Sequence, residues 1–175
     1  MIDLRELEAL EARWKEPGDS PLLPDAYGFQ AFRIPDFLRL LAVAVMAVAP
    51  MRSFLDAGCG IGTKVLIARD MFGLDAAGID VVPSYVEEAG RLGLGGMVAL
   101  VDVREFGGYG EQDIVYCYGP FREPDAQAAF EKRLHAAMRP GSILIAVMPT
   151  LKPRGWECLF RVPWQGVWRK PTERG

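Results

Sequence analysis

The sequence contains few of the residues that build disulfide or zinc frameworks. Its 175 residues include three cysteines and one histidine, and no two cysteines form a Cys-x-x-Cys pair. An odd number of widely spaced cysteines is typical of a reducing compartment and does not give the ligand spacing of a zinc site. We therefore expect a cytoplasmic protein that binds no metal.

A long hydrophobic run is also missing. The longest apolar run, Leu40–Met51, has twelve residues, whereas a helix that crosses a bilayer needs about 20. The first fourteen residues are charged and have a helical period, unlike a signal peptide. These features predict a buried helix within the apolar run and no membrane partner.

Neither sign of charge dominates the chain. The net charge is −3 at pH 7, which argues against a protein that grips a long track of nucleic acid. The two ends differ, because residues 1–36 carry eight acids and four bases, whereas residues 152–174 carry two acids and six bases. The basic end predicts either a solvated face or a contact with an anionic partner.

Segments with a helical period alternate with short apolar segments that are typical of buried strands. This alternation predicts a parallel, doubly wound sheet. Two aromatic-rich runs near the end of the chain predict an antiparallel hairpin. The expected fold is therefore α/β, a doubly wound, mostly parallel Rossmann-like sheet with an antiparallel C-terminal edge hairpin. Helices are expected at 4–14, 35–48, 62–73, 83–93 and 123–139, parallel strands at 53–58, 74–80, 97–103, 113–120 and 142–149, and the hairpin at 156–162 and 166–171.

The length fits a single domain that covers residues 1–175. Within it we expect an N-terminal helix and a possible lid over 1–34, a cofactor-binding core over 35–149, and a C-terminal hairpin and tail over 150–175. The lid is the stretch 17–34, which is rich in proline and glycine at its start and irregular. We expect a deletion of residues 1–26 to leave the fold intact.

The stretch LDAGCGIGT, residues 55–63, follows the first core strand and is the strongest functional signal. Gly58, Gly60 and Gly62 allow a sharp turn and a close approach of the backbone to a ligand. The spacing G-x-G-x-G differs from the dinucleotide pattern G-x-G-x-x-G, and Asp56 precedes the turn. A carboxylate at that position suits a ligand that carries an ammonium group and disfavours a pyrophosphate.

A second acidic residue ends the next strand. Asp80 lies 24 residues after Asp56, where a carboxylate can accept hydrogen bonds from both hydroxyls of a ribose. A ligand with an ammonium group and a ribose, but without a pyrophosphate, describes S-adenosylmethionine.

At this point the chain resembles the class I S-adenosylmethionine-dependent methyltransferases over residues 36–149. LDAGCGIGT is similar to the first motif of that family, GIDVVPSYVEEA to the second and VDVREF to the third. The resemblance implies that Asp80 binds the ribose, that Val81 and Val103 lie beside the adenine, and that Asp102 meets the adenine amino group. The cofactor-binding residues that it implies are Asp56, Gly58, Cys59, Gly60, Gly62, Asp80, Val81, Asp102 and Val103.

The fourth strand ends in YCYGPF, the position that faces the methyl group in the family. Tyr118, Gly119 and Pro120 are the candidate catalytic residues, and they are expected to shape the acceptor slot rather than to act as a base. The Asn/Asp-Pro-Pro-Tyr pattern of enzymes that methylate exocyclic amines of bases is absent. We expect Gly119→Val to block the slot.

The methyl acceptor has several candidates. A protein side chain or a small molecule is the leading hypothesis, and an RNA or DNA methyltransferase is an alternative that the basic tail favours. A further alternative is a non-catalytic S-adenosylmethionine-binding regulatory module. Trp156, Trp164 and Trp168 are expected to cover the core, with a stacking platform as the alternative. His135 is expected at a helix end, Cys117 in the core and GGYG, residues 107–110, in a loop.

Overall fold

The computed structural model describes residues 3–15, 24–47 and 50–172. These residues form one seven-stranded sheet with the strand order β3-β2-β1-β4-β5-β7-β6. The strands are β1 (Ser53–Ala57), β2 (Asp75–Asp80), β3 (Val98–Leu100), β4 (Ile114–Tyr118), β5 (Ile143–Val147), β6 (Glu157–Val162) and β7 (Gln165–Arg169). The helices are α1 (Leu4–Arg13), α2 (Ile34–Ala47), α3 (Thr63–Phe72), α4 (Pro83–Ala89) and α5 (Pro124–Ala137).

The pairing confirms the α/β fold that the sequence predicts. Strands β1 to β5 run parallel, β7 is antiparallel to β5, and β6 forms the outer strand of an antiparallel hairpin with β7. The chain leaves β1 toward β2 on one side and later returns to β4 on the other side. This reversal beside β1 is the switch point at which doubly wound sheets bind their ligands.

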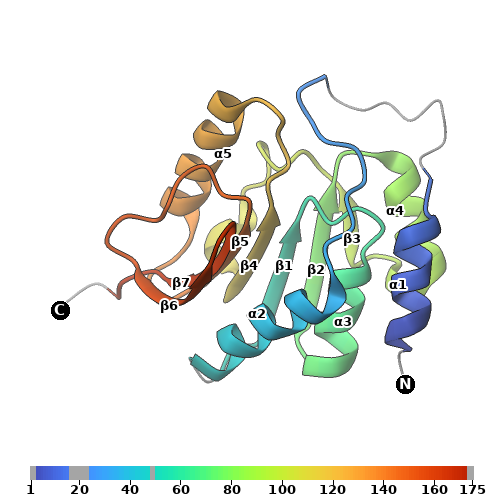
Figure 1. Ribbon diagram of the computed structural model, residues 1–175, viewed down its shortest axis with the longest axis horizontal. Coiled ribbons are helices and arrows are strands. Elements are labelled where there is room, and N and C mark those ends of the chain that lie inside the picture. The colour runs from blue at the N-terminus through green and yellow to red at the C-terminus, as the bar shows by residue number, and fades with distance from the viewer. Residues whose placement is uncertain (1–2, 16–23, 48–49, 173–175) are drawn as a thin grey trace.

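Helices cover the two faces of the sheet unequally (Figure 1). One hydrophobic cluster joins α2, α3 and α4 to one face, and a second cluster joins α5 to the other face. Phe37 of α2 packs edge-on against Phe54 of β1 and Tyr116 of β4. Figure 1 shows α1, in blue, lying beside α3 and α4 at one end of the molecule.

Three local features differ from the sequence-based expectation. The segment expected to be a loop around 107–110 forms a turn of 3-10 helix at Gly108–Glu111, because the Tyr109 ring is buried between Phe106 and Phe130 and anchors it. Strand β3 is shorter than expected, and α4 ends in a π-helical turn, Gly90–Leu94, where Gly93 has a positive φ of 78°.

Candidate active site

A cleft opens at the carboxyl ends of β1, β2 and β4. Its empty volume is about 900 Å³ when the open space at its mouth is included. The walls come from the turn after β1, the ends of β2 and β4, the segment after β3, and the chain between α1 and α2. The cleft is therefore at the switch point, where the fold alone predicts a ligand.

The turn after β1 has the backbone conformation that its glycines predict. Gly58, Gly60 and Gly62 have φ values of 84°, 54° and 81°, which side chains rarely adopt. A Cβ on Gly60 would lie 2.9 Å from the ring of Phe29, and one on Gly62 would lie 2.7 Å from Leu94. Glycine is thus required here by the backbone and by close packing as well as by any approach of a ligand.

Asp80 ties this turn to the end of β2. One carboxylate oxygen accepts the Gly60 N–H at 2.8 Å and the other accepts the Val82 N–H at 3.0 Å. The carboxylate is 7% exposed and lines the cleft beside Val81. The two oxygens of this carboxylate thus hold the turn after β1 against the end of β2.

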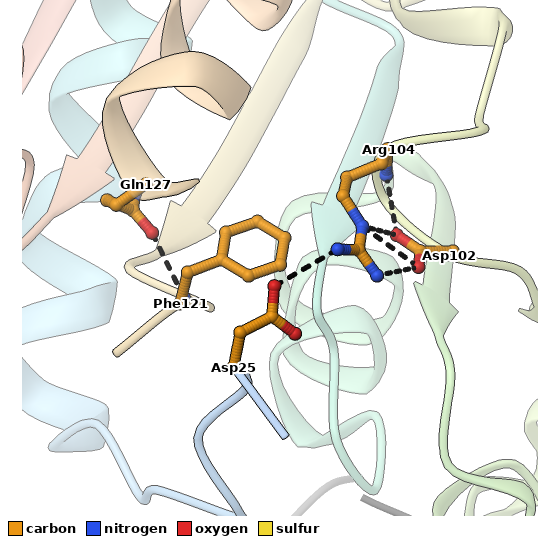
Figure 2. Close-up of polar contacts among 5 residues, drawn as sticks. All are labelled: Asp25, Asp102, Arg104, Phe121 and Gln127. Atoms are coloured by element: carbon orange, nitrogen blue, oxygen red, sulfur yellow. Dashed lines mark hydrogen bonds and ion pairs between the residues drawn. The ribbon is translucent and has the colours of Figure 1, made fainter. Parts of the chain in front are cut away.

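Asp102 lines the cleft just after the end of β3, where Arg104 binds it (Figure 2). The Arg104 guanidinium donates to both oxygens of Asp102, the shortest contact being 2.6 Å, and also to Asp25 at 3.1 Å. Burial would raise the pKa of Asp102, but the hydrogen bonds from Arg104 outweigh it and hold that pKa below its usual value. Arg104 also lies over the ring of Phe121, 5.2 Å from its centroid. The arginine thereby connects the end of β3 to the segment before α2.

Buried charges occupy the opposite end of the cleft. Glu11 of α1 accepts hydrogen bonds from Thr63 and Lys64 at the start of α3, and all three side chains are buried. Asp56 is 2% exposed, and one of its oxygens has no hydrogen-bond partner within the described part of the chain. Burial raises the pKa of Asp56 to about 8, the nearby Lys64 opposes this, and the charges of Asp80 and Glu11 add to it.

Residues 24–33 form a roof over the cleft. Ala26 pairs with Phe121 in an antiparallel bridge, and the Tyr27 N–H donates to the Pro120 carbonyl at 3.0 Å. Phe29 and neighbouring residues of this segment line the cleft directly. The sequence-based lid covered residues 17–34, of which 17–23 lie outside the described residues.

The end of β4 provides the remaining wall. Tyr118 and Pro120 line the cleft, and the Tyr118 ring packs edge-on against Phe32 with 5.5 Å between centroids. Gly119 is not among the lining residues. A Cβ on Gly119 would point toward Met148, 3.4 Å from its Cβ, so the expectation that Gly119→Val blocks the slot is wrong.

The comparisons with known proteins concern the fold. No protein-family model and no curated protein matches the sequence, but many solved structures match the model. An RNA methyltransferase from Salinibacter ruber, solved with S-adenosyl-L-homocysteine, superposes with a TM-score of 0.62 at 21% identity and covers 83% of this chain and 97% of that one. The fold is that of the class I methyltransferases.

Other structures with the class I methyltransferase fold match with lower TM-scores. One, solved for the conversion of a disulfide bond into a thioacetal group during echinomycin biosynthesis, has a TM-score of 0.59 at 21% identity and covers 81% of this chain and 82% of that one. Phosphoethanolamine N-methyltransferase 2 from Haemonchus contortus, in complex with S-adenosyl-L-methionine, has a TM-score of 0.54 at 22% identity. That match covers 66% of this chain and 28% of the other.

The class I methyltransferase fold brings most of the sequence-predicted residues together. The cleft is lined by Asp56, Gly58, Cys59, Gly60, Asp80, Val81, Asp102, Val103, Tyr118 and Pro120. Gly62 and Gly119 do not line it, because Gly62 faces Leu94 and Gly119 faces Met148. The residues of the first motif and those of the fourth strand therefore share one cleft.

Sequence reasoning missed the acidic wall that α1 provides. Glu11 lies on the apolar side of its helix, four residues after the buried Leu7, and this position was the available signal. The structure argues against the expectation that a deletion of residues 1–26 leaves the fold intact, because the deletion would remove Leu7 from the core and Glu11 from its ion pair with Lys64.

The remaining candidates lie outside the cleft. Cys117 is buried in the core, and His135 near the end of α5 packs against Trp156, where burial and the nearby Lys170 lower its pKa to about 4. Trp168 is 5% exposed and covers the core, whereas Trp164 is 74% exposed and does not. Across the described ranges, no three metal-binding side chains gather into a possible metal site. None of the described helices is long and apolar enough to span a bilayer.

Proposed function

We propose that the protein is an S-adenosylmethionine-dependent methyltransferase whose cofactor lies in this cleft. The observation that carries the proposal is the kind of polar group that lines the cleft. Four carboxyl groups line it against one lysine that is already paired with Glu11, so the cleft offers acceptors for an ammonium group and for hydroxyls, and among the described lining residues no unpaired cation for a phosphate. S-adenosylmethionine carries a sulfonium and an ammonium group. These four carboxylates belong to Glu11, Asp56, Asp80 and Asp102, and the lysine is Lys64.

The positions of the acids divide the cleft into two ends. Asp56 has a buried oxygen without a partner and would accept the cofactor's ammonium group. Asp80 at the end of β2 would accept the ribose hydroxyls, with the adenine beside Val81 and Val103. Asp102 would accept the adenine amino group while it holds Arg104. The solved structures of this fold with S-adenosyl compounds bound support the choice of cofactor.

When bound, the cofactor would supply an electrophilic methyl group on its positively charged sulfur. The protein must therefore hold the acceptor in line, about 3–3.5 Å from the methyl carbon. Tyr118 and Pro120 at the end of β4 are placed to do this beside the roof residue Phe32. The tip sequence YCYGPF contains no carboxylate, lysine or histidine. Positioning is thus the main contribution of this site.

The acceptor is a separate part of the proposal. The sequence favours a protein side chain or a small molecule, with RNA or DNA as the alternative, and the solved structures include an RNA methyltransferase and a phosphoethanolamine N-methyltransferase. The absence of a base at the tip favours one further candidate, a module that binds the cofactor without turnover. Because enzymes of this fold use many acceptors, the fold does not identify the acceptor, and features particular to this chain must do so.

Calorimetry tests the cofactor. S-adenosylmethionine and S-adenosylhomocysteine should bind, NAD should not, and Asp80→Ala should weaken binding tenfold or more. Asp75→Ala, at the exposed opposite end of β2, is the matched control and should bind normally. Tight NAD binding, or normal affinity in Asp80→Ala, would refute the cofactor site. Transfer of a radiolabelled methyl group to fractionated lysate then separates an enzyme from a binding module.

A further inference from the structure

Two residues beyond the cleft have an unusual backbone conformation. Met148 and Trp164 are the non-glycine residues of the described chain with a positive φ, 56° and 67° respectively. They lie 16 positions apart in the sequence, yet the Met148 N–H donates to the Trp164 carbonyl. Such strain persists only where the surrounding structure imposes it, and it concentrates at functional sites.

The conformation at Trp164 breaks a rule of turn chemistry. Pro163 and Trp164 form the two-residue loop between β6 and β7. When proline is the first residue of such a loop, a second residue with positive φ is usually glycine or asparagine. A tryptophan here costs stability relative to glycine, so its side chain needs another reason to be present.

Burial is not that reason, because both side chains point into solvent. Met148 is 51% exposed and Trp164 is 74% exposed. The strained backbone therefore presents two large apolar groups at the surface. We call these two residues the rim patch.

The rim patch lies outside the cleft, on the edge of the sheet where β4 also ends. Gly119 would place a Cβ 3.4 Å from the Met148 Cβ, and its chain neighbours Tyr118 and Pro120 line the cleft. Met148 follows β5, which lies next to β4, and Trp164 follows β6, which Figure 1 shows with β7 on the far side of β5 from β4. A molecule that reaches the slot at Tyr118 can rest on the rim patch.

Exposed basic residues flank the rim patch in the sequence, while the carboxylate of Glu131, which accepts the Thr150 and Leu151 N–H groups, is buried. Lys152 and Arg154 follow Met148 in the β5–β6 loop, and Arg161 precedes Trp164 at the end of β6. All three are exposed and have no ion-pair partner within the described residues. The acid of this stretch, Glu157, already binds Arg169 at 2.8 Å. These cations complement an anionic partner.

We propose that the rim patch binds a single-stranded segment of nucleic acid and presents one of its nucleotides to the slot at Tyr118. The inference rests on the proposed methyltransferase function of the cleft. An exposed indole offers a flat face on which any base can stack, and the cations of Lys152 and Arg161 can meet the flanking phosphates. An acidic peptide would use the cations but would leave the indole without a stacking partner. The indole thus favours nucleic acid over protein.

The test measures binding of a labelled 20-nucleotide single strand, as RNA and as DNA, to the complex with S-adenosylhomocysteine. We expect binding in low salt. A plot of the logarithm of the association constant against the logarithm of the salt concentration should have a slope of about −2, since each neutralised phosphate on a single strand contributes about −0.7. A poly-glutamate peptide of the same length should bind at least tenfold more weakly. Comparison of the RNA and DNA strands identifies which form the site prefers.

Substitutions by glycine make the test specific. Trp164→Gly and Met148→Gly relieve the backbone strain, so they should keep or raise the melting temperature while Trp164→Gly weakens strand binding at least fivefold. Arg161→Glu should also weaken binding. Met46→Ala is the matched control, because Met46 is 86% exposed on α2 and belongs to neither site.

Normal strand affinity in Trp164→Gly, equal affinity for poly-glutamate, or no strand binding at low salt would each overturn the inference. Failure of the proposed function has a different signature, because S-adenosylhomocysteine binding is measured by calorimetry on the same samples. If S-adenosylhomocysteine binds and the single strand does not, the cofactor site stands and the rim patch has no role in nucleic-acid binding. If S-adenosylhomocysteine does not bind, the proposed function is refuted.

Discussion

Cofactor binding should release a proton from Asp56. The carboxyl group is buried, and its pKa is raised to about 8, so it is mostly neutral at pH 7 before any ligand arrives. An ammonium group that hydrogen-bonds its unpartnered oxygen favours the charged form and lowers the pKa. The proton then leaves to solvent as the cofactor binds.

The size of the effect follows from this pKa. With a pKa of about 8, about 0.9 of the Asp56 carboxyl groups carry a proton at pH 7 and about 0.1 do so at pH 9. If the bound pKa lies well below 7, binding should release about 0.9 proton at pH 7 and almost none at pH 9. Because the bound state holds fewer protons, affinity should fall as the pH falls, by up to about tenfold per unit below pH 8.

Calorimetry in two buffers with different ionisation enthalpies measures the number of protons released. Asp56→Asn keeps the shape of the side chain but has no proton to lose, so the difference between the buffers should disappear. Asp56→Asn should also remove the contribution of this carboxyl group to the pH dependence of the free energy of unfolding. The raised pKa stabilises the folded state below pH 4, and this stabilisation is lost as the pH rises toward 8, by up to about 1.4 kcal/mol per unit. Equal heats in both buffers for the unmodified protein would refute the reasoning.

Four further predictions concern the walls of the cleft. Glu11→Ala should lower the free energy of unfolding by about 3–5 kcal/mol in a urea titration, because its lysine partner stays buried, whereas the exposed Glu8→Ala should not. Tyr118→Phe should reduce kcat by much less than the 10²–10⁴-fold of a general base, and a thousandfold loss with intact cofactor affinity would reveal one. Gly119→Val should lower the melting temperature yet leave S-adenosylhomocysteine affinity unchanged, because its side chain faces the end of β5. Ligand should slow amide hydrogen exchange over residues 27–33, and identical exchange with and without ligand would contradict a lid.

The fold and half of the cleft could be predicted because they depend on local patterns. Alternating strands and helices determine a parallel sheet, and the glycines with Asp56 and Asp80 occupy adjacent strand ends in any such sheet. The contacts that the sequence did not predict join segments far apart in the chain. Glu11 reaches Lys64 across 53 positions, and no periodicity within α1 can identify that partner.

The two failures at the acceptor side have a common physical origin. Gly119→Val was expected to block the acceptor slot, but Gly119 follows the end of β4 with a positive φ, and a Cβ on it would face Met148. The aromatic residues of the hairpin were expected to cover the core because that is the usual use of aromatic side chains. Trp168 does so, and Trp164 does not, because the turn places it outside the paired strands.

The exposure and the backbone conformation of Trp164 therefore indicate a function that its residue type alone does not. A buried aromatic lowers the free energy of the fold, so its presence needs no function. Trp164 gains little from burial and has a backbone conformation in which glycine would be more stable. Selection for stability would replace it, and the same reasoning applies to Met148, to which it is hydrogen-bonded. A strained and exposed pair of this kind, at the ends of β5 and β6, is expected of a binding surface that is selected for contact rather than for stability.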